Sequence, residues 1–146
     1  MKKVLFFVGI YCMMFIYSHA QNSFSMKLYA GSNASWGQGQ YVSIDEKGAG
    51  KYTLSDVGKG VIDSISFNLT KTQLVQLENA VNGIQFFKLN PTYNAKSRDG
   101  IRLSVKVSVS GKTNTVHWIN THPAETIQLL DKLNATLSDK GIIIHY

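Results

Sequence analysis

Cysteine is almost absent from this sequence, because Cys12 is the only one among 146 residues. It lies inside an apolar N-terminal segment, so residues 21–146 contain no cysteine at all. A domain without cysteine has no disulfide bond, no thiolate zinc site, no iron–sulfur cluster and no thiol nucleophile. We therefore expect a fold that is held together by its hydrophobic core alone.

The sequence also lacks the short motifs that mark common enzyme classes. It contains neither the G-x-S-x-G elbow of serine hydrolases nor the H-E-x-x-H motif of zinc peptidases. Residues 111–113, Gly-Lys-Thr, end like a phosphate-binding loop, but Lys106 stands where that motif needs glycine, and a hairpin is predicted there. His117, His122 and His145 are too widely spaced for a local metal site. We predict a protein without metal or cofactor that is not an enzyme.

The alternative is a hydrolase whose site only the fold assembles. Asp63, Asp99 and His117 carry the carboxylate and imidazole groups that general acid–base catalysis uses. Most aspartates of the chain stand beside glycine or in predicted turns, where a carboxylate caps backbone N–H groups. We favour a non-enzymatic binding protein and keep a hydrolase of cell-envelope peptide or glycan as the alternative.

Positive charge is in excess, but it is not concentrated. The chain has 15 Lys and Arg against nine Asp and Glu, and two of the lysines lie in the first 20 residues, which leaves a net charge of +4 beyond them. The basic residues do not form the dense stripe of a surface that follows a phosphate backbone. We predict no nucleic-acid partner.

The first 20 residues have the pattern of a signal peptide. Lys2 and Lys3 precede an apolar run over residues 4–17, and Ser18-His19-Ala20 places small residues before a cut at Gln21. The run is shorter than the roughly 20 residues that a membrane-spanning helix needs, and Cys12 is badly placed to accept a lipid. We expect residues 1–20 to be removed, residues 21–146 to form one domain, and the product to be periplasmic or extracellular without stable membrane insertion.

Alternating apolar residues predict several strands. Phe24, Met26, Leu28 and Ala30 alternate with polar residues, and shorter alternations follow over residues 41–44, 52–54 and 61–69. The clearest hairpin has strict alternation over residues 102–109, a turn at 110–112 and a return over 115–119. Residues 90–100 are rich in turn formers and are expected to form a loop.

Two segments predict amphipathic helices. Thr70 and Gln73 match a capping box, after which Leu74, Leu77, Val81 and Ile84 recur at helical spacing. Pro123 suits the first turn of a second helix, and Gly141 its end. The buried stripe predicted for that helix consists of Ile127, Leu130, Leu133 and Leu137. The order of elements predicts a single α+β domain, an antiparallel sheet with the two helices packed on one face.

Aromatic residues are the candidates for recognition. Trp36, Tyr41, Tyr93 and Trp118 lie in predicted strands or loops, and exposed aromatic side chains are common binding anchors. Trp36 lies in the glycine-rich segment 31–39, expected to be an exposed loop, and Trp118 is expected on the outer sheet face. We predict binding roles for Trp36, Tyr93 and Trp118, with a protein or peptide of the cell envelope as partner.

The order of residues between 69 and 133 resembles a family of secreted bacterial α+β domains of unknown function. The shared pattern is helix, phenylalanine pair, tyrosine, aspartate, hairpin, proline and helix; here these are Leu69-Thr70, Gln73-Leu74, Leu77, Ile84, Phe86-Phe87, Leu89, Tyr93, Asp99-Gly100, Gly111-Lys112, Val116, Pro123 and Leu130. The resemblance implies the α+β fold and export.

The same layout is similar, more remotely, to the emfourin-type proteins, which are small bacterial inhibitors of thermolysin-like metallopeptidases. Residues 31–39 match that family's early glycine-rich region in composition. This resemblance implies a non-enzymatic protein that occupies a peptidase cleft.

Overall fold

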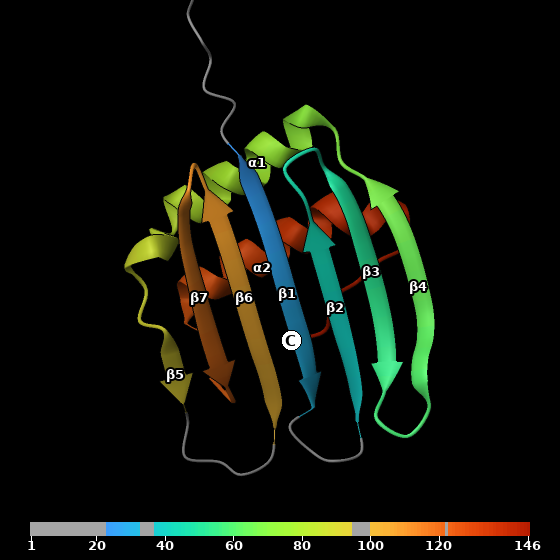
Figure 1. Ribbon diagram of the computed structural model, residues 1–146. Helices are drawn as coiled ribbons and strands as arrows, with labels where there is room; N and C mark the ends of the chain where they lie inside the picture. Colours follow the sequence, from blue (N-terminus) through green and yellow to red (C-terminus); the bar gives the residue numbers. More distant parts are fainter. Residues whose placement is uncertain (1–22, 33–36, 95–99, 122) are drawn as a thin grey trace, which may run out of the picture.

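Four strands, a helix, three further strands and a second helix follow one another along the chain (Figure 1). The computed structural model describes residues 23–32, 37–94, 100–121 and 123–146. The elements are β1 (Phe24–Ser32), β2 (Gln38–Ile44), β3 (Ala49–Asp56), β4 (Gly60–Asn68), α1 (Lys71–Gly83), β5 (Thr92–Asn94), β6 (Ile101–Val109), β7 (Lys112–Ile119) and α2 (Ala124–Leu137), with short 3₁₀ helices at Phe86–Lys88 and Ser138–Lys140. No helix of the described part is both long and apolar enough to cross a membrane.

The described strands form one sheet in the order β4-β3-β2-β1-β6-β7-β5. Every neighbouring pair is antiparallel except β5 and β7, which are parallel. The expected antiparallel sheet is therefore a mixed one, and part of the expected loop 90–100 is a strand. Three residues are too few to show a period-two pattern. The pairing comes from tertiary contacts such as the bond from His117 N to Pro91 O at 2.9 Å.

The start of α1 confirms the capping box. Thr70 Oγ1 accepts a hydrogen bond from Gln73 N at 3.2 Å, and Gln73 Oε1 accepts one from Thr70 N at 2.9 Å. Each bond satisfies a backbone donor that the helix itself leaves without a partner. The helix ends at Gly83, where the sequence predicts its stop.

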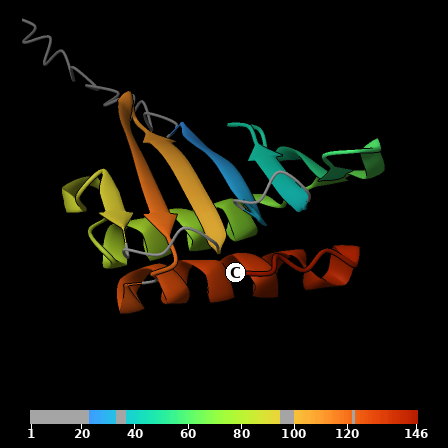
Figure 2. The same ribbon diagram turned by 90° about the horizontal axis from the view of Figure 1, so that it is seen from below.

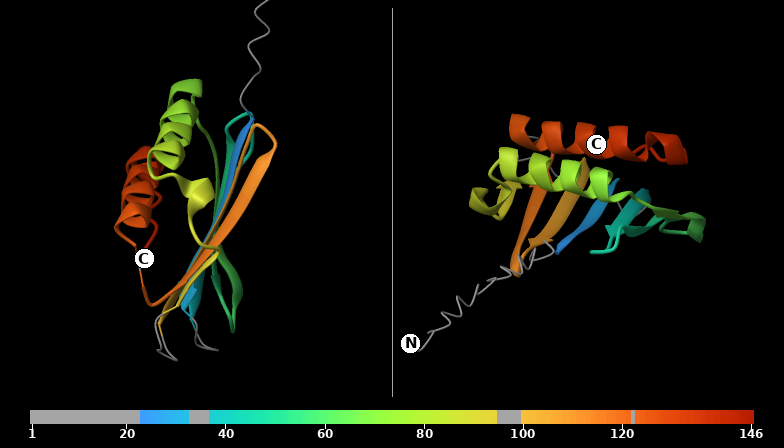
Figure 3. Two further views of the ribbon diagram at one scale, coloured as in Figure 1. Left: turned by 90° about the vertical axis from the view of Figure 1, so that its left-hand side faces the viewer. Right: turned by 90° about the horizontal axis from the view of Figure 1, so that it is seen from above.

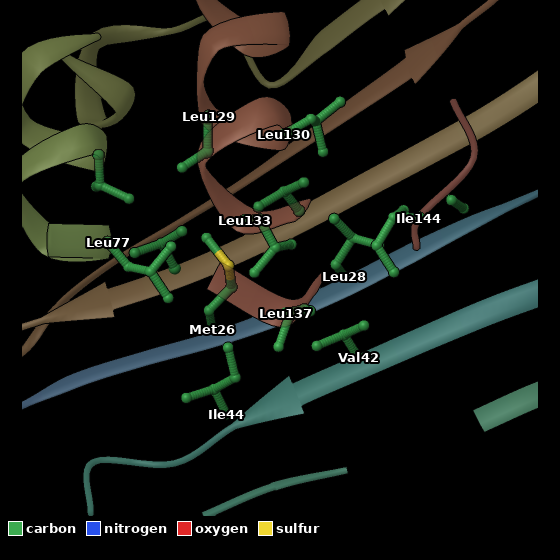
Figure 4. Packing of buried hydrophobic residues seen from close by; sticks show 14 of the residues in the cluster. Met26, Leu28, Val42, Ile44, Leu77, Leu129, Leu130, Leu133, Leu137 and Ile144 are labelled. Atoms are coloured by element: carbon green, nitrogen blue, oxygen red, sulfur yellow. The ribbon is translucent and has the colours of Figure 1, made fainter. Parts of the chain in front are cut away.

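Both helices lie on the same side of the sheet, next to each other (Figures 2 and 3). The buried stripe of α2 differs from the expected one, because Ile127 is 38% exposed and Leu129 is buried in its place. Leu129 and Leu130 are both buried because α2 contacts α1 as well as the sheet. Side chains of α2 such as Leu133 and Leu137 lie over those of β1 and β2 (Figure 4).

The C-terminal tail, residues 142–146, docks on the core. Ile142 and Ile144 are buried. Two amide side chains bind its backbone: Asn134 of α2 accepts from Ile144 N and donates to Ile144 O, at 2.8 and 3.0 Å. Gln40 of β2 donates to Ile143 O at 2.8 Å and accepts from His145 N at 2.8 Å. Backbone N–H and C=O groups of the tail are thus hydrogen-bonded on both sides, as in a strand, but their partners are side-chain amides and not the backbone of a neighbouring strand.

Candidate binding face

The face of the sheet opposite the helices is covered by no described element (Figures 2 and 3). Alternation along the strands decides which side chains lie on it, because successive residues point to opposite faces. In β1, for example, Met26 and Leu28 are buried under the helices, whereas Lys27 is exposed on the other side. We call this surface the open face.

A row of lysines crosses the open face from strand to strand. Lys51 of β3 lies opposite Ser43 of β2, Ser43 lies opposite Lys27 of β1, and Lys27 lies opposite Lys106 of β6. All three lysines are exposed. With neighbouring strands about 4.8 Å apart, the three ammonium groups share a band roughly 15 Å wide. We call this set the lysine row, and its outer ends are Ser66 of β4 and Thr115 of β7.

A pair of tyrosines lies two residues further along the strands. Tyr29 and Tyr41 are opposite each other on β1 and β2, and their ring centroids are 4.7 Å apart at an interplanar angle of 43°. Tyr41 is 47% exposed. Side chains two residues apart on one strand lie about 7 Å apart, so the aromatic pair borders the lysine row.

Two glycines make room for Tyr29. Gly31 and Gly39 face each other in the β1–β2 register. A Cβ atom on Gly31 would lie 2.5 Å from the hydroxyl of Tyr29, and one on Gly39 would lie 2.9 Å from its ring. Gly31 and Gly39, which the sequence predicts to lie in an exposed loop, are therefore strand residues. The ring of Tyr29 lies over both of them.

The open face is hollowed along the lysine row. Adjoining hollows of about 860, 290 and 40 Å³ all have Lys27 in their lining, and the first two share Lys51 as well. The hollow of 290 Å³ combines the lysine row with both tyrosines. The open face therefore has a shallow groove rather than a deep pocket.

The three lysines of the row form no ion pair in the described part of the chain. The ion pair found among the described residues, between Lys140 and Asp139 at 2.7 Å, lies in the opposite layer. Asp56 and Asp63 lie on the helix side of their strands by alternation. Asp45 and Glu46 of the β2–β3 turn do line the 860 Å³ hollow at one end of the row, where the Asp45 carboxylate accepts hydrogen bonds from Lys47 N and Ala49 N. Lys27 and Lys106 are directly opposed like charges, an arrangement that destabilises a sheet. Such a site is suited to an external anion.

Two of the predicted binding residues pack with the core, Trp118 inside it and Tyr93 at its margin. Trp118 is fully buried under the helices, not on the outer face where we expect it, because β7 presents Val116 and Trp118 to the core and His117 to the open face. Tyr93 stacks on Trp118 with centroids 6.3 Å apart, and its hydroxyl accepts from Asn90 N at 3.1 Å. The buried ring of Trp118 has no surface to offer a partner. Tyr93 is half-buried and its ring packs against the core, away from the lysine row, so neither residue enters the proposal below. Trp36 lies outside the described residues.

The groups of the alternative hydrolase site do not come together among the described residues. Asp63 lies on β4 and His117 on β7, which are five strand positions apart and therefore roughly 24 Å apart. They also lie on opposite faces of the sheet. Asp99 is outside the described residues. The described part contains no group of three or more His, Cys, Asp or Glu that could hold a metal ion.

A second hollow, of about 670 Å³, lies on the helix side of the sheet between β1–β4 and the C-terminal tail. Its lining includes Ile65, Ile143, Asp63 and His145. The buried amide of Gln40 at its base also donates to the Tyr52 hydroxyl at 3.0 Å, so its described polar contacts are satisfied within the protein.

Sequence reasoning misses the lysine row. Each lysine is visible as the exposed member of an alternating segment, but their alignment depends on the register of four strands. Tyr41 is among the aromatic residues that the sequence indicates as candidates for recognition, whereas its partner Tyr29 has the pattern of an ordinary exposed strand residue. No protein-family model matches this chain, and no curated protein matches it either.

Proposed function

We propose that this chain is an exported, non-enzymatic binding protein whose open face binds an acidic protein or peptide segment of the cell envelope. The observation that carries the proposal is the lysine row, three exposed lysines aligned across the sheet, none of which forms an ion pair within the described part of the chain. Export rests on the signal-peptide pattern of residues 1–20.

The chemistry of the open face suits an extended acidic segment. An extended chain presents alternate side chains about 6.8 Å apart on one face, a spacing that flexible lysine side chains can match. Tyr29 and Tyr41 supply aromatic surface beside the charges, and rigid tyrosines give contact area at low entropic cost. Ser43, Ser104 and Thr53 supply hydroxyl donors in the same groove.

The peptidase-inhibitor version of this function remains a narrower proposal. It rests on the emfourin-type resemblance and on the segment 31–39 with Trp36, and the ends of that segment, Gly31 and Gly39, lie at the Tyr29 edge of the open face. In this version the acidic segment belongs to a metallopeptidase. No described observation favours the hydrolase alternative, so we do not propose it.

Binding of a designed peptide tests the proposal. The probe is a synthetic peptide with glutamate at every second position, and the comparison peptide has lysine at the same positions. We expect the full chain after signal removal to bind only the glutamate peptide, with an affinity that falls as salt is added, because the attraction between exposed charges is screened. Isothermal titration calorimetry measures both affinities.

Charge-removing variants locate the site. Replacing Lys27 and Lys106 together by glutamine is expected to raise the Kd for the glutamate peptide at least about tenfold, which corresponds to about 1.4 kcal/mol. The matched control is Lys71→Gln, which removes an exposed charge from α1 in the opposite layer. Equal affinity for the two peptides, or an equal loss in the Lys71→Gln variant, contradicts the proposal.

A further inference from the structure

The outer edge of β4 has no partner strand in the described part of the chain, because β4 is the first strand in the sheet order. Leu69 N donates to Gly48 O at 2.8 Å, which directs the backbone groups of residue 69 toward β3. Backbone direction alternates along a strand, so Phe67 and Ile65 also face β3. Ser64, Ser66 and Asn68 therefore direct their N–H and C=O groups outward.

This edge carries little of the protection that natural sheets use. Charged side chains, proline, strong bulges or a very short strand normally prevent an edge from pairing with another chain. β4 is nine residues long and contains no lysine, arginine or proline. Val61 and Ile62 are 65% and 46% exposed, and Val57 in the adjoining turn is also exposed. By contrast, the opposite edge strand, β5, has only three residues.

The protection that β4 does have is confined to its first half. A register irregularity at Leu54/Ser55 distorts the pairing opposite residues 61–63. The carboxylate of Asp63 accepts a hydrogen bond from Ser64 N at 2.7 Å, so that outward donor is already occupied. Ser66 and Asn68 keep their outward N–H groups, and Ser66 is the centre of the outward set 64, 66 and 68.

We propose that two copies of this chain pair antiparallel through β4, about a two-fold axis at Ser66. In this register Ser66 faces Ser66 of the second copy, and Ser64 faces Asn68 of the second copy. The C=O of Ser64 accepts from the Asn68 N–H of the second copy, while the Ser64 N–H stays with the Asp63 carboxylate. On the helix side, Ile65 comes opposite Phe67 of the second copy, an apolar cross-strand pair. Asp63 comes opposite Leu69 of the second copy and is not opposed by a like charge.

The occupant is a second copy because the edge is complementary to itself in this register. Shifting the axis by one residue, to Ile65, would place Asp63 opposite Phe67 and Asn68 opposite Ile62, where the pairing of β4 with β3 is irregular. A two-fold contact uses the same patch on both subunits, and it closes after two copies instead of extending into a fibre. The pairing also brings the exposed Val61 and Ile62 next to the second subunit.

The dimer would join the two lysine rows into one. Ser66 lies opposite Lys51 in the β3–β4 register, so it is the end of the lysine row at this edge. An axis at Ser66 therefore aligns the row of one subunit with that of the other across a continuous sheet. The proposal itself rests on the edge geometry and not on the acidic ligand.

Cysteine trapping tests the register. Residues directly opposite in a hydrogen-bonded antiparallel pair have Cα atoms about 5.5 Å apart, within the range of about 4.4–6.8 Å that a disulfide bridges. In a chain with Cys12→Ser, which removes the only native cysteine, Ser66→Cys is expected to form a disulfide-linked dimer under mild oxidation. Non-reducing electrophoresis measures the linked fraction.

Two neighbouring positions are the matched controls. Ser64→Cys alone and Asn68→Cys alone are expected to link much less, while a mixture of the two proteins links efficiently because these residues face each other across the dimer. Equal linkage at all three single positions, or none at Ser66→Cys, overturns the proposal. Equal linkage would indicate random collision between molecules. No linkage at Ser66→Cys would mean that β4 pairs with a strand of another protein or with no strand.

A proline variant tests the dimer without cysteine. Ser66→Pro removes an outward N–H and no bond to β3, so the fold is expected to persist, as circular dichroism can check. Light scattering after size exclusion should show dimer for the parent and for Ser66→Ala, and monomer for Ser66→Pro. A monomeric parent at all concentrations overturns the proposal. Binding of the glutamate peptide by the monomeric Ser66→Pro variant separates the two proposals, because the lysine row is intact in each subunit.

Discussion

Lys27 and Lys106 lie directly opposite each other on β1 and β6, both exposed and neither paired with a described carboxylate. Lys106→Thr removes this repulsion and is expected to stabilise the domain by about 0.2–1 kcal/mol, while it weakens binding of the glutamate peptide. Urea denaturation measures the stability. Lys112→Thr is the control, since Lys112 lies opposite Val109 and its replacement removes no like-charge pair. An equal gain in stability in this variant would mean that the strand propensity of threonine is the cause.

The contact between Gly39 and Tyr29 predicts a coupled pair of substitutions. Gly39→Ala places a methyl group against the Tyr29 ring and is expected to cost about 1–3 kcal/mol. In a Tyr29→Ser background the ring is gone, so the same change should cost less by at least about 0.5 kcal/mol. A double-mutant cycle by urea denaturation measures the difference. The same cost in both backgrounds would contradict the role of Gly39 as space for the ring.

Gln40 bonds the tail to the sheet, so its loss should release the tail. Gln40→Leu leaves the Ile143 carbonyl and the His145 N–H without their described partner, and we expect a loss of about 1–3 kcal/mol. Hydrogen exchange at the His145 amide should become faster. Gln38→Leu, an exposed position on the same strand, is the control and should leave that exchange unchanged.

Thr126 is a buried residue whose hydroxyl has no hydrogen-bond partner among the described atoms. Thr126→Val replaces this hydroxyl by a methyl group and is expected to stabilise the domain by about 1 kcal/mol, a rise in Tm of about 4 °C. Thr136→Val is the control, because Thr136 Oγ1 donates to Lys132 O at 2.8 Å and its loss brings no such gain. Differential scanning calorimetry compares the two; a Tm no higher in Thr126→Val than in the parent would count against the prediction.

Tyr146 predicts a pH dependence at the alkaline end. Its hydroxyl donates to Asp131, and this hydrogen bond, followed by burial and the nearby carboxylate charge, raises the pKa of Tyr146 from 10.0 to about 12. The contribution of the bond to stability is complete below pH 10 and is lost as the pH rises toward 12, because the unfolded phenol ionises first. The stability difference between the parent and Tyr146→Phe should therefore shrink over this range in urea denaturation. A difference that stays constant from pH 10 to 12 would show that the bond does not contribute.

Local signals in the sequence predict much of the fold. The alternation at residues 24–30, the hairpin around Gly111 and the capping box at Thr70 each depend on neighbours within a few residues, and the structure contains all three. The prediction that Ile127 is buried is wrong, and the parallel strand β5 is not predicted at all. Burial of Ile127 and pairing of β5 both depend on packing between elements distant in the sequence.

The sequence by itself determines the local pattern of each strand, namely which apolar and polar residues alternate along it and which positions carry a charged side chain or a glycine. Only the tertiary structure decides what those residues face. Strand register aligns Lys51, Lys27 and Lys106 in one row, places Trp118 in the core and sets Asp63 and His117 far apart. The physical reason is that side-chain alternation is a local property of the backbone, whereas register and the face that the helices cover arise from contacts between residues remote in sequence.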